Sequence, residues 1–111
     1  MAQHETYIRK NYHGQWEART VIMLSPTHEF TVLTAKRSTG SVATTASVGQ
    51  RDGISVVHMV FQDYSKTLHL QKYPRVTQKV IETQHNEILK DIDAWTNEAR
   101  AQYGLELEYA A

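Results

Sequence analysis

The segment best suited to binding an anion is Lys36-Arg37-Ser38-Thr39-Gly40, which combines two cations, two hydroxyls and a glycine. A turn of this composition can hold a phosphate through its side chains and its backbone N–H groups. Strand-end turns are also commonly polar simply because they lie at the surface. The segment therefore indicates a candidate anion site, with a solvated turn as the alternative.

Charge is divided unevenly along the chain. Residues 1–80 contain ten Lys/Arg and five Asp/Glu, whereas residues 81–111 contain two Lys/Arg and seven Asp/Glu. The formal net charge of zero therefore conceals a basic first part and an acidic second part. A chain without net charge has no overall field that attracts nucleic acid or an anionic membrane.

Most aromatic residues also lie in the basic part. Cations beside exposed rings can follow a phosphate backbone and stack unpaired bases. The alternatives are that the rings pack under a helix, or that the basic sheet of one subunit meets the acidic helix of another. The candidate phosphate contacts are Arg19, Lys36, Arg37, Arg51 and Lys66, and the candidate stacking residues are Tyr12, Trp16 and Tyr64.

The six histidines show no spacing typical of a metal site, since His-x-His, His-x₃-His and HExxH are all absent. A tight hairpin at Asp63-Tyr64 would place His58 opposite His69, where the pair could bind a metal or titrate near neutrality. A shift of one residue in register would separate them. His85 lies on an apolar stripe and is predicted to be a core or interface histidine with one hydrogen-bond partner. No metal or other cofactor is predicted.

Motifs for catalysis are also absent. The lack of cysteine excludes disulfides, thiolate zinc sites and a cysteine nucleophile. GxSxG, SxxK and glycine-rich phosphate loops do not occur. Asp91 and Asp93 are two residues apart, so they face different directions on a helix. We therefore expect a binding protein rather than an enzyme.

The N-terminus has neither the basic nor the apolar region of a signal peptide. The longest uninterrupted apolar run, Val21 to Leu24, is far too short to span a bilayer. These features predict a cytoplasmic protein without a membrane partner.

Before Pro74, hydrophobic alternation with a period of two predicts strands. Short connections between them favour an antiparallel meander. The segment 54–63 is apolar on both faces, which indicates a central strand or a subunit interface. The expected strands cover residues 5–12, 16–24, 30–36, 41–50, 54–63 and 67–73, of which the first is the least defined.

From Val76 onward the apolar period becomes helical. Pro74 suits the start of a helix and Gly104 its end. A helix over about residues 75–103 would be roughly 40 Å long, more than a small sheet covers, so we expect part of it to contact another subunit. The predicted interface residues are Ile88, Ile92, Trp95 and Tyr103.

The sequence thus predicts one α+β domain over residues 1–111. Residues 1–73 would form an antiparallel β-meander of five or six strands. One long C-terminal amphipathic helix would pack on one face within residues 74–104, before a short tail at 105–111. The expected core combines Ile81, Ile88, Ile92 and Trp95 of the helix with Ile22, Phe30, Ile54, Val56 and Val60 of the sheet.

Two functions agree with this architecture. The first is a small non-catalytic protein that binds nucleic acid, single-stranded, through a basic and aromatic face of the sheet. The second is a homodimeric protein–protein interaction module that docks an acidic partner and binds no nucleic acid. A homodimer is the expected assembly in either case.

Overall fold

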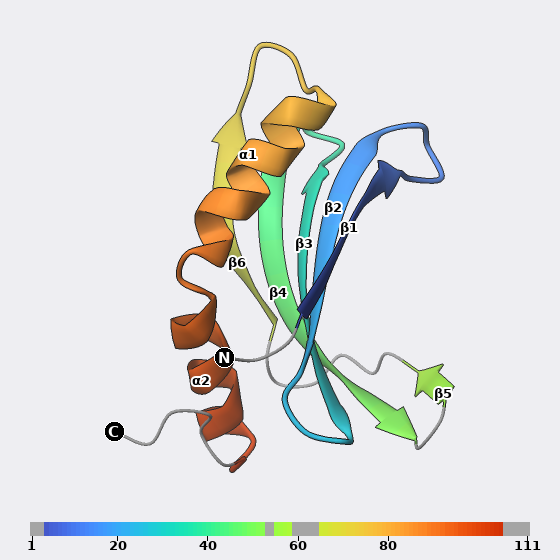
Figure 1. Ribbon diagram of the computed structural model, residues 1–111. Helices are drawn as coiled ribbons and strands as arrows, with labels where there is room; N and C mark the ends of the chain where they lie inside the picture. Colours follow the sequence, from blue (N-terminus) through green and yellow to red (C-terminus); the bar gives the residue numbers. More distant parts are fainter. Residues whose placement is uncertain (1–3, 53–54, 59–64, 106–111) are drawn as a thin grey trace.

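The computed structural model describes residues 4–52, 55–58 and 65–105, and the side chains of residues 5–49 and 65–105. Within these residues, six strands precede two helices (Figure 1). This order confirms the predicted α+β class and the antiparallel sheet. The elements are β1 (His4–Lys10), β2 (Trp16–Met23), β3 (His28–Lys36), β4 (Ser41–Asp52), β5 (Ser55–His58), β6 (Ser65–Lys72), α1 (Gln78–Leu89) and α2 (Ile92–Gln102).

The sheet is a meander up to β5, and β6 departs from it. Strands β1 to β5 pair in chain order, whereas β6 pairs with β4. β4 is twelve residues long and has β3 along one edge. Its other edge is shared, because the part from Ser41 to Ser47 pairs with β6 and the end near Gln50 and Asp52 pairs with β5.

In this topology His58 and His69 do not lie opposite each other, so the pair that a tight hairpin would have allowed is not formed. His58 lies opposite Gln50, and His69 lies opposite Thr44. The two histidines are separated because β5 and β6 join the same edge of one long strand at different places, instead of pairing with each other. Of the predicted strand 54–63, only Ser55–His58 is a strand within the described residues, and residues 54 and 59–63 lie outside them.

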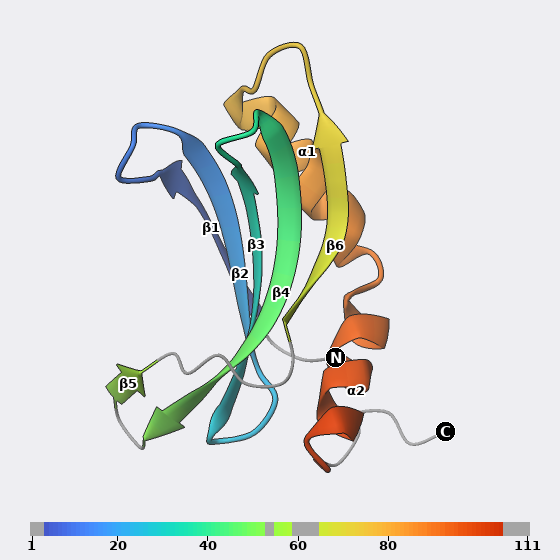
Figure 2. The ribbon, with the colours of Figure 1, turned by 180° about the vertical axis from the view of Figure 1, so that it is seen from behind.

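The predicted single helix is matched only in part, because the helical segment is divided into α1 and α2 with Lys90 and Asp91 between them. α1 lies across one face of the sheet, and the chain changes direction before α2 (Figure 2). The change allows Ile92 and Ala99 to pack in the core. The helices have 12 and 11 residues, so each is roughly 17 Å long. The excess length that predicted a subunit contact is therefore not present in either helix.

Local signals define the ends of the helical segment. The N-cap Thr77 accepts a hydrogen bond from the N–H of Val80 through its hydroxyl oxygen, at 3.3 Å. At the other end Gly104 has a φ of 67°, and the N–H of Leu105 donates to the carbonyl of Arg100 at 2.8 Å. This is a Schellman ending, so the predicted role of Gly104 is confirmed.

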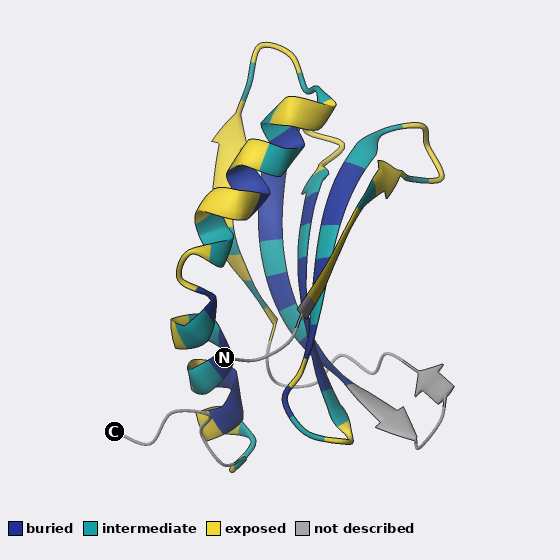
Figure 3. Cartoon of the chain, viewed as in Figure 1, coloured by how far each residue is buried: buried dark blue, intermediate teal, exposed yellow. Residues whose placement is uncertain are grey.

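The core lies between the helices and the facing side of the sheet (Figure 3). Of the predicted core residues, Ile22, Phe30, Ile81 and Ile92 are buried. Trp95 packs against the core while partly exposed, and Ile88 is half-buried. Ile54 and Val60 lie outside the described residues, as does the side chain of Val56.

A chain of polar side chains runs through this core. His85 has no exposed surface, and its ring bonds two threonines instead of the one partner predicted. Nε2 lies 2.7 Å from the Thr20 hydroxyl, and Nδ1 lies 2.7 Å from the Thr34 hydroxyl. Burial lowers the pKa of His85 to about 4, because the charged imidazolium is poorly solvated there.

The chain continues on both sides of His85. On one side Thr20 bonds the hydroxyl of Thr6 at 2.8 Å. On the other, Thr34 bonds Thr44 at 2.7 Å, and Thr44 bonds Gln84 Nε2 at 3.0 Å. The Tyr73 hydroxyl closes the chain by donating to Gln84 Oε1 at 2.7 Å. Seven side chains from four strands, α1 and the segment after β6 thus form one hydrogen-bonded unit.

A backbone carbonyl sets the direction of these bonds. Gln84 Nε2 also lies 3.3 Å from the carbonyl oxygen of Val42, which can only accept, so the amide nitrogen must face it. Thr44 then accepts from Gln84 and passes its own proton to Thr34, and Thr34 donates to His85 Nδ1. His85 Nε2–H donates to Thr20. The opposite assignment would leave the buried Thr44 proton without an acceptor among these side chains.

We therefore expect neutral His85 in the Nε2–H form. A long-range ¹H–¹⁵N correlation spectrum of the ¹⁵N-labelled protein at pH 7 should show Nε2 protonated and Nδ1 unprotonated. Replacing Gln84 with Glu removes the amide donor that sets the direction, so the tautomer preference should weaken or reverse. A wild-type ring protonated at Nδ1 would contradict the assigned direction.

Candidate functional site

Three connecting segments meet at one end of the sheet. They are the β1–β2 turn, the β3–β4 turn and the connection from β6 to α1, at the top in Figures 1 and 2. Antiparallel pairing brings the two turns together, since alternate connections of a meander lie at the same end. An open pocket of about 500 Å³ lies between them. Its walls include Gln15 and Trp16 of the first segment, Lys36 and Gly40 of the second, and Tyr73 and Arg75 of the third.

This basic end, comprising residues 10–16, 36–41 and 72–79, contains six Lys/Arg and no Asp/Glu. All six cationic side chains are exposed. None of them takes part in an ion pair with another described residue. α1 also begins here and has no acidic residue in its first turn, so this turn supplies no carboxylate to offset the positive end of the helix dipole. The six are Lys10, Lys36, Arg37, Lys72, Arg75 and Lys79.

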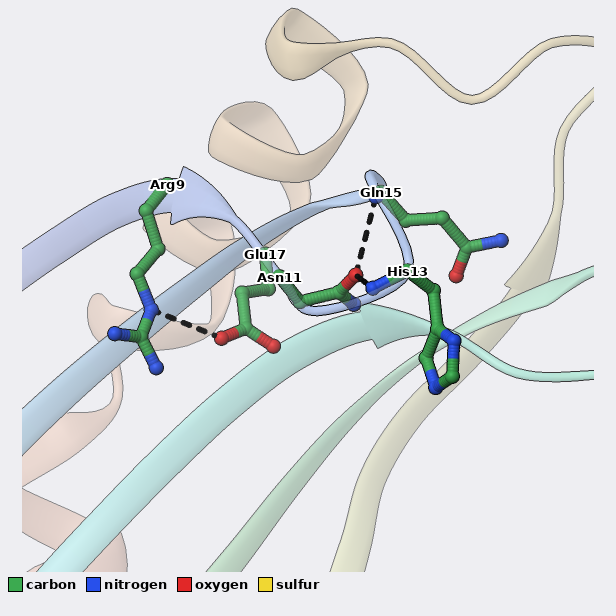
Figure 4. A network of polar contacts seen from close by, with 5 residues as sticks. All are labelled: Arg9, Asn11, His13, Gln15 and Glu17. Carbon is green, nitrogen blue, oxygen red and sulfur yellow. Dashed lines mark hydrogen bonds and ion pairs between the residues drawn. The ribbon is translucent and has the colours of Figure 1, made fainter.

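The β1–β2 turn is held by Asn11 (Figure 4). The Asn11 side-chain oxygen accepts hydrogen bonds from the backbone N–H groups of His13 at 2.9 Å and Gln15 at 3.1 Å. On the adjoining strands, Arg9 Nε lies 3.2 Å from a carboxylate oxygen of Glu17. Glu17 is buried, so the carboxylate nearest this turn in sequence is both paired and removed from the surface.

The β3–β4 turn contributes side chains more than backbone donors. The N–H of Gly40 donates to the carbonyl of Arg37 at 2.9 Å, and the N–H of Arg37 donates to the carbonyl of Ser41 at 2.7 Å. These two donors are therefore used within the turn. Arg37 extends toward β6, where Nη2 donates to the Thr67 hydroxyl at 3.3 Å. Lys36 is the cation of this turn that lines the pocket.

Three rings accompany these cations. Tyr12 is 99% exposed at the tip of the first turn. Trp16 is half-buried and packs on a core cluster, with Lys10 Nζ 5.4 Å from its ring centroid. Tyr73 is half-buried, its hydroxyl is fixed by Gln84, and burial raises its pKa above the usual 10. The Tyr12 ring is thus exposed and contacts the ring of the histidine that follows it, whereas the other two rings are anchored beside the pocket.

The structure divides the predicted binding residues. Tyr12, Trp16, Lys36 and Arg37 lie together at the basic end. Arg19 lies in the middle of β2, and alternation with the buried residues Ala18 and Thr20 places it on the face away from α1.

The other predicted residues do not belong to the basic end. Lys66 lies near the opposite end of β6, where Nζ is 2.9 Å from a Glu98 oxygen and 4.8 Å from the Trp95 ring centroid. Arg51 is at the far end of β4, and its side chain is not described. Tyr64 lies outside the described residues.

Sequence reasoning missed five residues of this end: Lys10, Lys72, Tyr73, Arg75 and Lys79. A usable signal was present, because three segments of seven, six and eight residues are free of Asp and Glu while each contains Lys or Arg. The first two segments flank alternate turns of the predicted meander. Their meeting could therefore have been expected.

The predicted interface residues make contacts inside the chain. Ile92 is buried in the core, and Trp95 and Tyr103 pack against it while partly exposed. Ile88 is half-buried. The homodimer stays a prediction.

Within the described ranges, no group of three or more His, Asp or Glu side chains could hold a metal ion. No helix in that part of the chain is long and apolar enough to cross a membrane. Comparisons with protein-family models, with curated proteins and with solved structures found no match.

Proposed function

We propose that this chain is a non-catalytic protein that binds single-stranded nucleic acid through the basic end of its sheet. The observation that supports the proposal is the convergence of three acid-free segments, with six exposed cations, around a pocket that two rings line. Cations alone would suit any polyanion. The rings favour nucleic acid, because a stacked base contributes about 1–3 kcal/mol and every base offers a flat face.

The binding surface differs from the one expected from the sequence. The sheet face toward the helices is covered by α1 and by core residues of α2, so bases cannot spread over it. A strand would instead cross the turns at the basic end. Exposed Tyr12 and half-buried Trp16 offer stacking positions there, and the cations lie around them.

Binding is expected to weaken log-linearly with salt. For a single strand, each phosphate contact contributes about −0.7 to the slope of the logarithm of the binding constant against the logarithm of the salt concentration. Six cations that each contact one phosphate would therefore give a slope of about −4 at most. Fluorescence anisotropy of a labelled oligothymidylate, titrated at several salt concentrations, measures both affinity and slope. Lys36→Glu should weaken binding about tenfold at low salt. It should also make the salt dependence shallower by about 0.7, the contribution of one phosphate contact.

Lys90→Glu is the matched control, because Lys90 is equally a surface lysine but lies between the two helices, away from the basic end. It should change affinity less than about twofold. Absence of binding at low salt to single-stranded DNA and RNA would overturn the proposal. Equal losses in the two variants would show that net charge, rather than the basic end, governs binding.

A further inference from the structure

The pocket at the basic end has the size of a small-molecule site. Its volume of about 500 Å³ falls within the range of about 300–1,000 Å³ typical of such sites. A pocket of this size holds one nucleotide-sized group, not a run of them. Its walls come from three segments that are far apart in sequence, so the folded sheet is needed to form it.

The two aromatic residues in its walls are held in place before any ligand arrives. Trp16 and Tyr73 both pack on the core cluster formed by Ala18, Val42 and Ile81. Tyr73 is fixed further by its 2.7 Å hydrogen bond to Gln84, which belongs to the buried polar chain. Rings fixed in this way lose little conformational entropy on binding, which favours affinity.

The two cations in the walls complement these rings. Lys36 ends β3 and Arg75 follows Pro74 in the connection to α1, so they come from different segments of the basic end. Both are exposed, and neither takes part in an ion pair with another described residue. Arg can bind a phosphate through two parallel N–H groups, whereas Lys adds a point charge.

We propose that this pocket is a subsite for one nucleotide unit, with the phosphate held by Lys36 and Arg75 and the base against Trp16. The inference rests on the proposed function and goes beyond it by assigning one position of the bound strand to one cavity. The same chemistry could be presented by a free mononucleotide or by one nucleotide of a strand.

The test follows the fluorescence of Trp16 in a Trp95→Phe background, which leaves Trp16 as the remaining tryptophan of the chain. Thymidine 5′-monophosphate should change this fluorescence saturably, with a Kd of about 1 mM at low salt. Thymidine and inorganic phosphate should each bind at least tenfold more weakly, because each offers half of the recognised group. An oligothymidylate should bind more tightly than the mononucleotide and compete with it if the strand supplies the unit. If the oligonucleotide binds without displacing the mononucleotide, the natural ligand of the pocket is a free nucleotide rather than one unit of a strand.

Arg75→Gln and Lys79→Gln form the matched pair, since each removes one exposed charge of the basic end but only Arg75 lines the pocket. Arg75→Gln should weaken mononucleotide binding at least fivefold, and Lys79→Gln less than twofold. If the oligonucleotide binds while the mononucleotide gives no saturable change up to about 10 mM, the subsite is wrong and the proposed function stands. Equal effects of the two variants, or equal binding of phosphate and mononucleotide, would also overturn the subsite. If neither probe binds, the proposed function itself fails.

Discussion

Lowering the pH from 7 to 4 is expected to reduce the free energy of unfolding by about 3 kcal/mol through His85 alone. Burial lowers the folded-state pKa of this histidine to about 4, whereas an unfolded chain keeps a value near 6.5. Between these values the unfolded state binds one more proton than the folded state, so stability falls as the pH falls. One pKa unit corresponds to about 1.4 kcal/mol, which gives the expected loss. At pH 4 the His85 ring is half protonated in the folded state, and about one pH unit lower both states are protonated and this contribution stops changing.

Chemical denaturation followed by circular dichroism, repeated at steps from pH 7 to pH 4, measures the effect. Carboxylates also titrate toward the acidic end of this range, so the quantity of interest is the difference between the wild type and His85→Leu. The variant should lack the loss between pH 6.5 and 4.5. An NMR titration of the His85 ring provides an independent reading. A ring that titrates above pH 5.5 in the folded protein would contradict the prediction.

Replacing His85 with Leu is expected to destabilise the protein at pH 7 by about 2–4 kcal/mol. The volumes are similar, so the loss comes mainly from the two threonines that the ring bonds. The Thr34 proton loses its acceptor and the Thr20 oxygen loses its donor, both at fully buried positions. Leaving a buried polar group unsatisfied costs about 1–3 kcal/mol. Urea denaturation of the two proteins at pH 7 gives the difference.

A triple variant with Thr20→Val and Thr34→Val added to His85→Leu provides the control. Removing both members of a hydrogen bond is much less costly than removing one, so the triple variant should recover part of the loss. Recovery should be incomplete, because Thr44 keeps its bond from Gln84 but loses Thr34. A triple variant less stable than the single variant would show that shape, rather than unsatisfied polar groups, dominates at this site.

Local features of the fold were predictable because local chemistry determines them. Alternation along residues 16–24 corresponds largely to the more and less buried faces of β2, whereas four consecutive residues of β3, 29–32, are buried on both faces. Gly104 ends α2 through a positive φ that glycine adopts without strain. In contrast, the position of β6 depends on which edge of a long β4 offers free backbone groups. Long-range packing determines that β6 pairs with β4, and the short connections between the predicted strands did not indicate this pairing.

The break between α1 and α2 was hidden by the very pattern that predicted a helix. Ile88 and Ile92 are four residues apart, so the apolar stripe continues across Lys90 and Asp91 without interruption. Neither glycine nor proline occurs there. Tertiary contacts of Ile92 with the core are what favour a change of direction, and hydrophobic period alone does not contain that information.

The candidate site was predictable in part, since four of the predicted binding residues, from two separate turns, lie at the basic end. The cations Lys36 and Arg37 were recognised as a pair within one turn. Arg75 was missed because it meets Lys36 only in the folded sheet. Lys66, which was predicted with the two cations of that turn, lies near the other end of β6 beside Glu98, a residue 32 positions away in sequence. Composition identified the basic part of the chain. Only the topology showed which of its cations lie at the same end of the sheet.

The hydrogen-bonded chain from Tyr73 through His85 to Thr6, whose middle members are buried, has a consequence for how this domain can diverge. All hydrogen bonds of the chain run in the same direction, from each member to the next. Replacing a single member therefore leaves one neighbour with an unpaired donor or acceptor. Substitutions that keep the protein folded should therefore occur as matched sets. In homologues, Thr20, Thr34, Thr44, Gln84 and His85 would be expected to covary, with polar positions exchanged together for apolar ones. These five positions would then leave a coevolutionary signature that joins four elements of the fold.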